Sequence, residues 1–193
     1  MSTPVPQPKT DSAQPANLPV ASVPAATVPP KPAIAASPQQ PAPGHPASAP
    51  APAFPNPLAH LPIPFRGVDH AAKGYHCEAT VSPDEVVTVA ELLDKEGLAL
   101  DTITGVDWMA EGQMEVVYDY FHPAKALRVV VRTRIPRDQP EIATIQKVFP
   151  GANWHERETH DFFGIRFLGH PDLTPFLLPE DADFHPLRKD YAA

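Results

Sequence analysis

The sequence predicts an α+β fold: a single mixed, largely antiparallel sheet with two to three helices, between a disordered Pro/Ala-rich arm and an irregular C-terminal tail. Three observations support this. Segments with strand-like alternation and segments with helical periodicity succeed one another between residues 75 and 168. Prolines concentrate before residue 65, and after residue 168 the chain has further prolines and no periodicity.

Proline and alanine define the N-terminal arm. Of the 28 prolines, 19 lie in residues 1–64, interleaved with Ala, Ser and Gln. Proline fixes φ and removes a backbone donor, and alanine offers little apolar surface, so this segment cannot offset the entropy lost on ordering. We expect residues 1–64 to be a disordered tether and residues 65–193 the folded domain. An adaptor that recruits aromatic-groove domains through the arm is an alternative.

The folded domain is predicted to begin with a strand and a helix. Residues 75–80 alternate apolar and polar side chains, which indicates a half-buried strand. Ser82, Pro83 and Glu85 form a helix-start pattern, with an N-cap, a proline at the first position and a capping box. The apolar positions that follow, up to a glycine, predict a helix over 83–96.

Three strands are predicted next, over 98–106, 113–121 and 127–135. These segments are rich in β-branched or aromatic residues and are separated by turn signals. Short connections make them antiparallel neighbours.

Two further helices and a strand complete the prediction. Pro140 can open a short helix that ends before Pro150. A charged helix is expected over 152–163, stopped by a glycine, and a last strand over 165–168. No glycine-rich phosphate loop is visible, so nothing indicates nucleotide binding.

The charge balance of the domain excludes nucleic acid as a partner. The chain has a formal charge of −8, and residues 1–64 contribute +1, so residues 65–193 carry −9. Phosphates require a basic surface. One basic cluster stands out, which is either a solvated strand face or a docking site for an acidic subunit. Its members are Lys125, Arg128, Arg132, Arg134 and Arg137.

Cysteine content and hydropathy limit the cofactors that the chain can hold and the cellular locations that it can have. The single cysteine, Cys77, cannot supply the four thiolates of an ordinary iron–sulfur cluster. No stretch approaches the roughly 20 apolar residues needed to cross a bilayer, so membrane association is expected only through partners. The N-terminus lacks the basic start and continuous apolar core of a secretory signal, and we expect a protein that is not exported.

The predicted charged helix has the highest concentration of titratable side chains, because two histidines and three carboxylates fall within residues 155–161. His155 and His160 are five residues apart, which separates them by about 140° on a regular helix, so they cannot share one ion there. A salt-bridged structural helix and a buried polar network at a subunit interface are the other interpretations. If the backbone is irregular, however, several side chains could still come together as the metal site of a small metal-dependent hydrolase. The candidates are His155, Glu158, His160, Asp161, His170 and His185.

Several ordered blocks over residues 70–191 carry a family resemblance. They are Glu156-Arg157-Glu158 with Asp161 and Gly164, then Gly169-His170-Pro171-Asp172-Leu173, Leu178-Pro179-Glu180-Asp181 and His185-Pro186-Leu187-Arg188-Lys189-Asp190-Tyr191. This pattern resembles the 30 kDa subunit family of respiratory complex I. That family includes the C subunit of bacterial NADH:quinone oxidoreductase and the equivalent small subunit of energy-converting membrane-bound NiFe hydrogenases.

The resemblance implies a non-redox hydrophilic assembly subunit, without a cofactor or metal of its own and not catalytic alone. It would pack on a large subunit, 49 kDa-like or NiFe hydrogenase large-like, beside iron–sulfur subunits, and support electron transfer. Its place would be the cytoplasmic face of the inner membrane, with membrane contact only through partners. The partner-interface residues expected are Trp154, Glu156, Arg157, Glu158, Asp161, Phe162, His170, Asp172, Arg188, Lys189 and Asp190.

Arg157 is expected to pair with a carboxylate, either Asp172, Asp190 or an acid of the partner. The chain departs from the family pattern at Thr174-Pro175-Phe176, where one or two arginines are usual, and it ends two residues after Tyr191. Both departures favour a hydrogenase-type complex, with NADH:quinone oxidoreductase as the other possibility.

Overall fold

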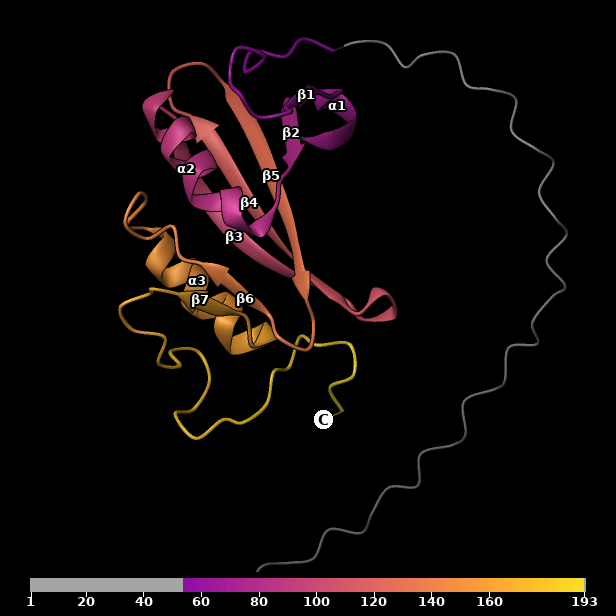
Figure 1. The fold of residues 1–193 in the computed structure, drawn as a ribbon, viewed down its shortest axis with the longest axis vertical. Coiled ribbons are helices and arrows are strands. Elements are labelled where there is room, and N and C mark those ends of the chain that lie inside the picture. Colours follow the sequence, from indigo (N-terminus) through magenta and orange to yellow (C-terminus); the bar gives the residue numbers. More distant parts are fainter. Residues whose placement is uncertain (1–53, 193) are drawn as a thin grey trace, which may run out of the picture. The chain divides into compact units, whose positions relative to one another are not determined.

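A computed structural model describes residues 54–192 (Figure 1). The first 53 residues of the predicted arm lie outside the described part. The main sheet has five strands in the order β1-β2-β5-β4-β3, and a second sheet pairs β6 with β7. The strands are β1 Arg66–Gly67, β2 Cys77–Thr80, β3 Ala99–Trp108, β4 Gln113–His122, β5 Leu127–Pro136, β6 Glu141–Ala143 and β7 Arg166–Leu168. The helices are α1 His70–Lys73, α2 Val86–Lys95 and α3 Ala152–Phe163.

The α+β fold with a mixed, largely antiparallel sheet is confirmed. β3, β4 and β5 form the predicted antiparallel meander, and their bounds differ from the prediction by at most two residues. β2 joins β5 in parallel, with Cys77 opposite Val129. The two-stranded sheet of β6 and β7 is an addition to the single sheet that was predicted.

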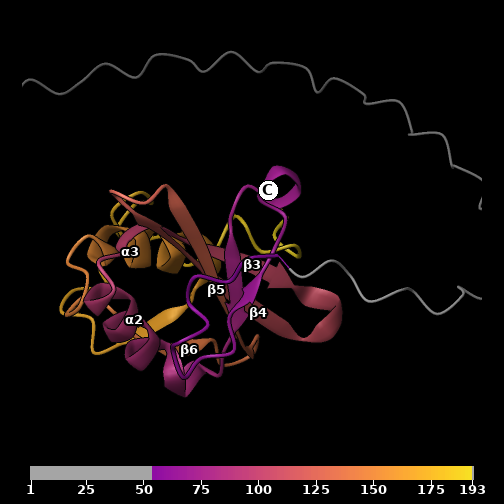
Figure 2. The ribbon, with the colours of Figure 1, turned by 90° about the horizontal axis from the view of Figure 1, so that it is seen from above.

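One face of the main sheet carries the core, and α2 and α3 both cover that face (Figure 2). Alternate residues of β4 point into it, because side chains along a strand alternate between faces. They are Met114, Val116, Tyr118 and Tyr120, each at most 1% exposed. α2 contributes Val86, Val89, Ala90 and Leu93 at helical spacing.

Ion pairs cover the opposite face of the sheet. Arg132 and Arg134 approach the Glu115 carboxylate at 3.6 and 3.7 Å. Arg128 pairs with Asp101 at 2.9 Å, and Arg134 also pairs with Glu111. Most of the basic cluster is therefore neutralised within the chain, which favours a solvated strand face over a docking site for an acidic subunit.

The prediction of a short helix starting at Pro140 is wrong. Residues Glu141–Ala143 form β6, which pairs in parallel with Arg166–Leu168 and is supported by the Glu141–Arg166 ion pair. Pairing with a strand 25 residues further on overrides the local proline signal, and local sequence cannot show this.

The expected domain boundary at residue 65 also needs correction, because part of the expected arm packs on the sheet. Leu58 is 2% exposed and belongs to the core. The Asn56 amide donates to the Phe65 carbonyl at 2.6 Å, and the Leu58 N–H donates to the Asn56 Oδ1 at 3.0 Å. Residues 54–64 therefore belong to the folded unit. One buried leucine among prolines is too weak a signal to predict this.

Candidate functional site

Helix α3 has the predicted bounds, Ala152–Phe163, and ends because Gly164 adopts φ 72°, from which its N–H donates to the His160 carbonyl. Four of its five buried residues, Ala152, Glu156, Thr159 and Phe163, recur every three or four positions, and the fifth is Asp161. Gly105 on β3 allows the helix to approach, since a Cβ there would lie 2.6 Å from the Phe163 Cδ2. This packing places the carboxylate of Glu156 inside the protein.

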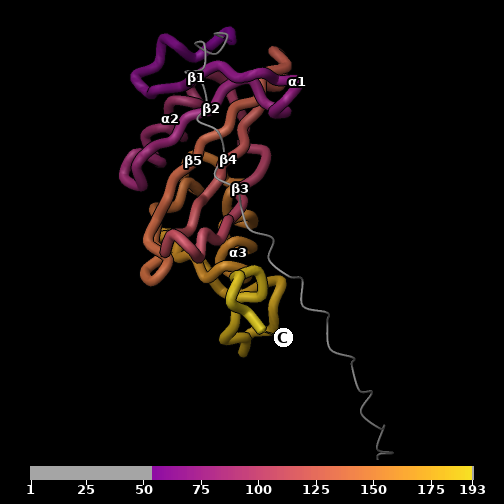
Figure 3. Tube along the Cα trace, turned by 90° about the vertical axis from the view of Figure 1, so that its right-hand side faces the viewer, coloured from indigo at the N-terminus to yellow at the C-terminus, as the bar shows by residue number. Residues whose placement is uncertain are grey.

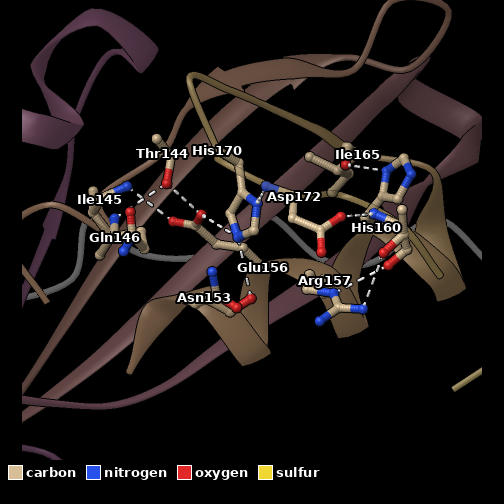
Figure 4. A network of polar contacts seen from close by, with 11 residues as sticks. Thr144, Ile145, Gln146, Asn153, Glu156, Arg157, His160, Ile165, His170 and Asp172 are labelled. Carbon is tan, nitrogen blue, oxygen red and sulfur yellow. Dashed lines mark hydrogen bonds and ion pairs between the residues drawn. The ribbon is translucent and has the colours of Figure 1, made fainter. Parts of the chain in front are cut away.

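Glu156 forms the centre of a buried polar network (Figure 4). Its side chain is fully buried, and its carboxylate accepts from the Thr144 hydroxyl at 2.5 Å and from the Ile145 N–H at 2.9 Å. The buried His170 Nε2 lies 3.9 Å from the carboxylate. The network ties α3 to the loop after β6 and to the start of the tail.

Burial changes the protonation of both titratable members of this network. Removal from water raises the pKa of Glu156 to about 7, against the lowering effect of the Thr144 and Ile145 hydrogen bonds. Burial lowers the pKa of His170. Both groups thus tend towards their neutral forms near neutral pH, as expected for ionisable groups taken out of water.

Asp161 holds the middle of the tail on α3. Its side chain is buried, and the Oδ2 accepts three backbone N–H groups, from Phe176, Leu177 and Leu178, at 3.1, 2.8 and 3.3 Å. Three donors on one oxygen fix a turn that has no regular hydrogen bonding of its own.

The end of the tail is held by a second buried carboxylate, Asp107 on β3, whose side chain is 1% exposed. The Arg137 guanidinium donates to both its oxygens at 2.8 and 3.1 Å and also to Asp190 at 2.6 Å. The Lys189 N–H donates to Asp107 at 2.8 Å. The Arg137 hydrogen bond, followed by that of the Lys189 amide, outweighs burial and lowers the pKa of Asp107.

Further contacts anchor the tail to the C-terminal end of α3. The Arg188 Nε donates to the Phe163 carbonyl at 2.7 Å, and the Leu187 N–H donates to the Phe162 carbonyl at 3.1 Å. The His185 Nδ1 lies 2.9 Å from the Asp161 carbonyl. Figure 3 shows the tail beside α3, at the opposite end of the domain from α1 and β1.

Arg157 does not pair with Asp172 or Asp190 as expected. Its Nε donates to the Thr174 carbonyl at 3.0 Å, and its Nη2 to the Thr174 hydroxyl at 3.3 Å. Its guanidinium lies 5.0 Å from the centre of the Phe176 ring and 5.5 Å from that of Trp154. Thr174, one of the departures from the family pattern, is therefore the partner of Arg157 within the described chain.

The expected interface residues divide into two groups. Glu156 and Asp161 are internal, and His170 and Arg188 contribute internal hydrogen bonds. Those with more than a third of their surface free are Trp154, Glu158, Asp172, Lys189 and Asp190, while Arg157 and Phe162 are intermediate. The internal group thus builds the site, and the exposed group faces outward from it.

Sequence reasoning assigned neither Thr144 nor Asp107 to the site, and it placed Arg137 only in the basic cluster. One sequence pattern could have indicated that Asp107 is buried: it continues the alternation of Ile103 and Gly105 on the core face of β3. A carboxylate at such a position needs a buried partner. Thr144 left no comparable signal.

The metal-dependent hydrolase has no support. Among residues 54–192 no three His, Cys, Asp or Glu side chains converge as a metal site would require. The Nδ1 atoms of His160 and His185 instead lie within hydrogen-bonding distance of the backbone carbonyls of Ile165 and Asp161.

The chain belongs to the family described as respiratory-chain NADH dehydrogenase, 30 Kd subunit, whose pattern matches residues 79–193. It is 42% identical over 115 residues to the C subunit of NADH-quinone oxidoreductase from Roseiflexus castenholzii, covering 57% of this chain and 66% of that protein. It is 41% identical over 120 residues to the C subunit of F(420)H(2) dehydrogenase from Methanosarcina mazei, covering 58% of this chain and 73% of that protein.

The fold is similar to a chain in the structure of the membrane-bound sulfane sulfur reductase, an archaeal respiratory membrane complex. The TM-score is 0.61 at 28% sequence identity, over 70% of this chain and 81% of that chain. Within residues 54–192, no helix has the length and apolar character needed to span a membrane.

Proposed function

We propose that this protein is a non-redox assembly subunit of a complex I-like membrane oxidoreductase. It packs on the catalytic large subunit through a docking face formed by α3, β7 and the tail, and so supports electron transfer without carrying electrons. Family membership supports the general role, because its named relatives are subunits of NADH-quinone oxidoreductase and F(420)H(2) dehydrogenase. The structure supports the choice of face.

The distribution of exposed apolar side chains carries the proposal. Nine large hydrophobic residues are exposed in the described part, and seven belong to the docking face. These are Trp154, Leu168, Phe176, Leu177, Phe184, Leu187 and Tyr191. Exposed apolar groups gathered on one face mark interaction sites in soluble domains.

The docking face is also preorganised. Asp161, Asp107 and Arg188 fix the tail through buried or half-buried hydrogen bonds. A segment held in place before binding loses little conformational entropy on association, which leaves more of the contact energy for affinity. The irregular tail therefore has the properties of an interface element rather than of a loose end.

The partner of this face is a large subunit of the 49 kDa-like or NiFe hydrogenase large-like type, with iron–sulfur subunits nearby. The assembly lies at the cytoplasmic face of the inner membrane, and this chain reaches the membrane only through those partners. The chain needs no cofactor in this role. The named relatives favour a dehydrogenase complex over a hydrogenase.

Replacing Trp154 and Leu187 by serine is expected to weaken binding to the large subunit. Each side chain is more than half exposed, at 58% and 53%, so the fold loses little. Truncation of a central interface residue costs about 2 kcal/mol, or about thirtyfold in the dissociation constant. Co-purification of the large subunit with the tagged chain measures this effect.

Met109→Ser is the matched control, because Met109 is 47% exposed at the β3–β4 turn, outside the docking face. It is expected to leave co-purification unchanged. If the Trp154 and Leu187 variants retain the large subunit as well as the control does, the choice of this face is wrong.

A further inference from the structure

A hollow of about 540 Å³ is lined by residues near β1 and α1. These two elements lie at the end of the domain opposite α3 and the tail (Figure 3). Its size is in the range of small-molecule sites. Phe54, Val68 and Leu127 give it apolar walls, and three segments distant in sequence meet there. These are residues 54–57, the region from β1 to the start of β2, and the β4–β5 turn.

The walls of the hollow are held in place by specific contacts. The backbone carbonyls of Phe54 and Pro55 lie so close to Gly67 that a Cβ there would clash with them. Asn56 bonds to the Phe65 carbonyl. Ala126 in the β4–β5 turn has φ 48°, the only positive φ of a non-glycine residue in the described chain. Strained residues of this kind concentrate at ligand sites, where the surroundings maintain them.

The polar groups around the hollow are basic or donating. His70, His76 and Lys125 line it, and among residues 54–192 no Asp or Glu does. An adjoining hollow of about 560 Å³, which has no acidic lining residue in the described part of the chain either, adds His122 and Arg128. Within residues 54–192, Lys125 has no carboxylate within ion-pair distance, whereas Arg128 pairs with Asp101. In a domain of net charge −9, this concentration of cationic groups needs an explanation.

His76 offers a hydrogen-bond donor at this place. Its Nδ1 accepts the Arg128 N–H at 3.0 Å, so the neutral ring carries its proton on Nε2. The Nε2–H has no partner in the described part of the chain. The ring of His70 stacks on the ring of His76, with 4.1 Å between the ring centroids. Burial and the neighbouring His70 lower the pKa of His76, and a bound anion would oppose this effect.

We propose that this hollow binds a small organic anion with an apolar body, of the fatty-acid or aryl carboxylate class. Lys125 and the His76 Nε2–H hold the carboxylate, and the body of the ligand lies against Phe54, Val68 and Leu127. This site is independent of the docking face, because the elements beside it, β1 and α1, lie at the opposite end of the domain from α3 and the tail (Figure 3).

Titration of the full chain with decanoate tests the proposal, with the histidine ring signals followed by NMR. Decanoate is expected to shift the signals of His70 and His76 saturably and to raise the pKa of His76. Decanol, which has the same chain without the charge, is expected to bind more weakly by about fivefold, the size of one partly exposed ion pair.

Lys125→Ala and Lys147→Ala form a matched pair, because both lysines are exposed and only Lys125 lines the hollow. Lys125→Ala is expected to weaken decanoate about fivefold and Lys147→Ala to have no effect. The proposal is overturned if decanoate leaves both histidine signals unshifted, if decanol binds as tightly as decanoate, or if the two lysine variants behave alike.

Discussion

Arg137→Ala is expected to lower the free energy of unfolding by about 3 to 5 kcal/mol, because it leaves the buried carboxylate of Asp107 without its ion partner. The Asp107 side chain is 1% exposed and that of Arg137 18%, so water cannot replace the guanidinium fully. Urea denaturation at pH 7 measures the loss. The same change frees Asp190, and the end of the tail should become more mobile.

Two variants separate the stranded charge from general damage. Arg128→Ala removes an arginine whose side chain is 49% exposed and whose partner Asp101 is 39% exposed, and it should cost at most about 1 kcal/mol. Adding Asp107→Asn to Arg137→Ala removes the stranded charge and should restore part of the stability. A loss for Arg137→Ala no larger than that for Arg128→Ala would contradict the assignment of Asp107 as a buried anchor of the tail.

The second large effect is a pH dependence of stability that comes from Glu156. Its folded-state pKa is raised to about 7, above the ordinary value of 4.5 for a glutamate. Its contribution is therefore complete below about pH 4.5 and is lost as the pH rises through 7. A shift of this size corresponds to about 3 kcal/mol.

Glu156→Gln removes the titration and keeps one of the two accepting oxygens, which can still accept the Ile145 N–H, while the amide nitrogen can donate to the Thr144 hydroxyl. The difference in unfolding free energy between this variant and the unchanged protein should therefore grow by about 3 kcal/mol in favour of glutamine between pH 4.5 and pH 8. Burial lowers the pKa values of His76 and His170, which makes the stability of the protein rise with pH. This contribution is present in both proteins and therefore largely cancels in the difference between them. Denaturation curves at several pH values provide the measurement.

Glu158→Gln is the control for this experiment, since Glu158 is exposed on the same helix. Its difference from the unchanged protein should stay nearly constant over the same range. A Glu156→Gln difference that is equally flat would mean that Glu156 is ionised in the folded protein, as an exposed carboxylate is.

The sequence predicts the elements whose signals are local. Helix α3 has its predicted bounds because a periodic charged segment meets Gly164, which can adopt a positive φ. The β3-β4-β5 meander is predicted within two residues because short turns join its strands. Both features depend on residues close together in the chain.

The errors arise where distant residues decide the outcome. Pro140 precedes a strand because Arg166–Leu168 pairs with it, and Leu58 is buried by a sheet formed later in the chain. In the Glu156-Arg157-Glu158 motif, the sequence analysis expected Arg157 to pair with a carboxylate, whereas the buried titratable group is Glu156. The spacing of Ala152, Glu156, Thr159 and Phe163 could have shown this, because these positions share one helix face.

Amide hydrogen exchange of the chain, alone and bound to its large subunit, tests the central claim most directly. If the docking face binds that subunit, exchange should slow in residues 170–191 and stay unchanged in the β4–β5 turn at the opposite end. Slower exchange in that turn, with residues 170–191 unaffected, would contradict the claim that this face is the interface.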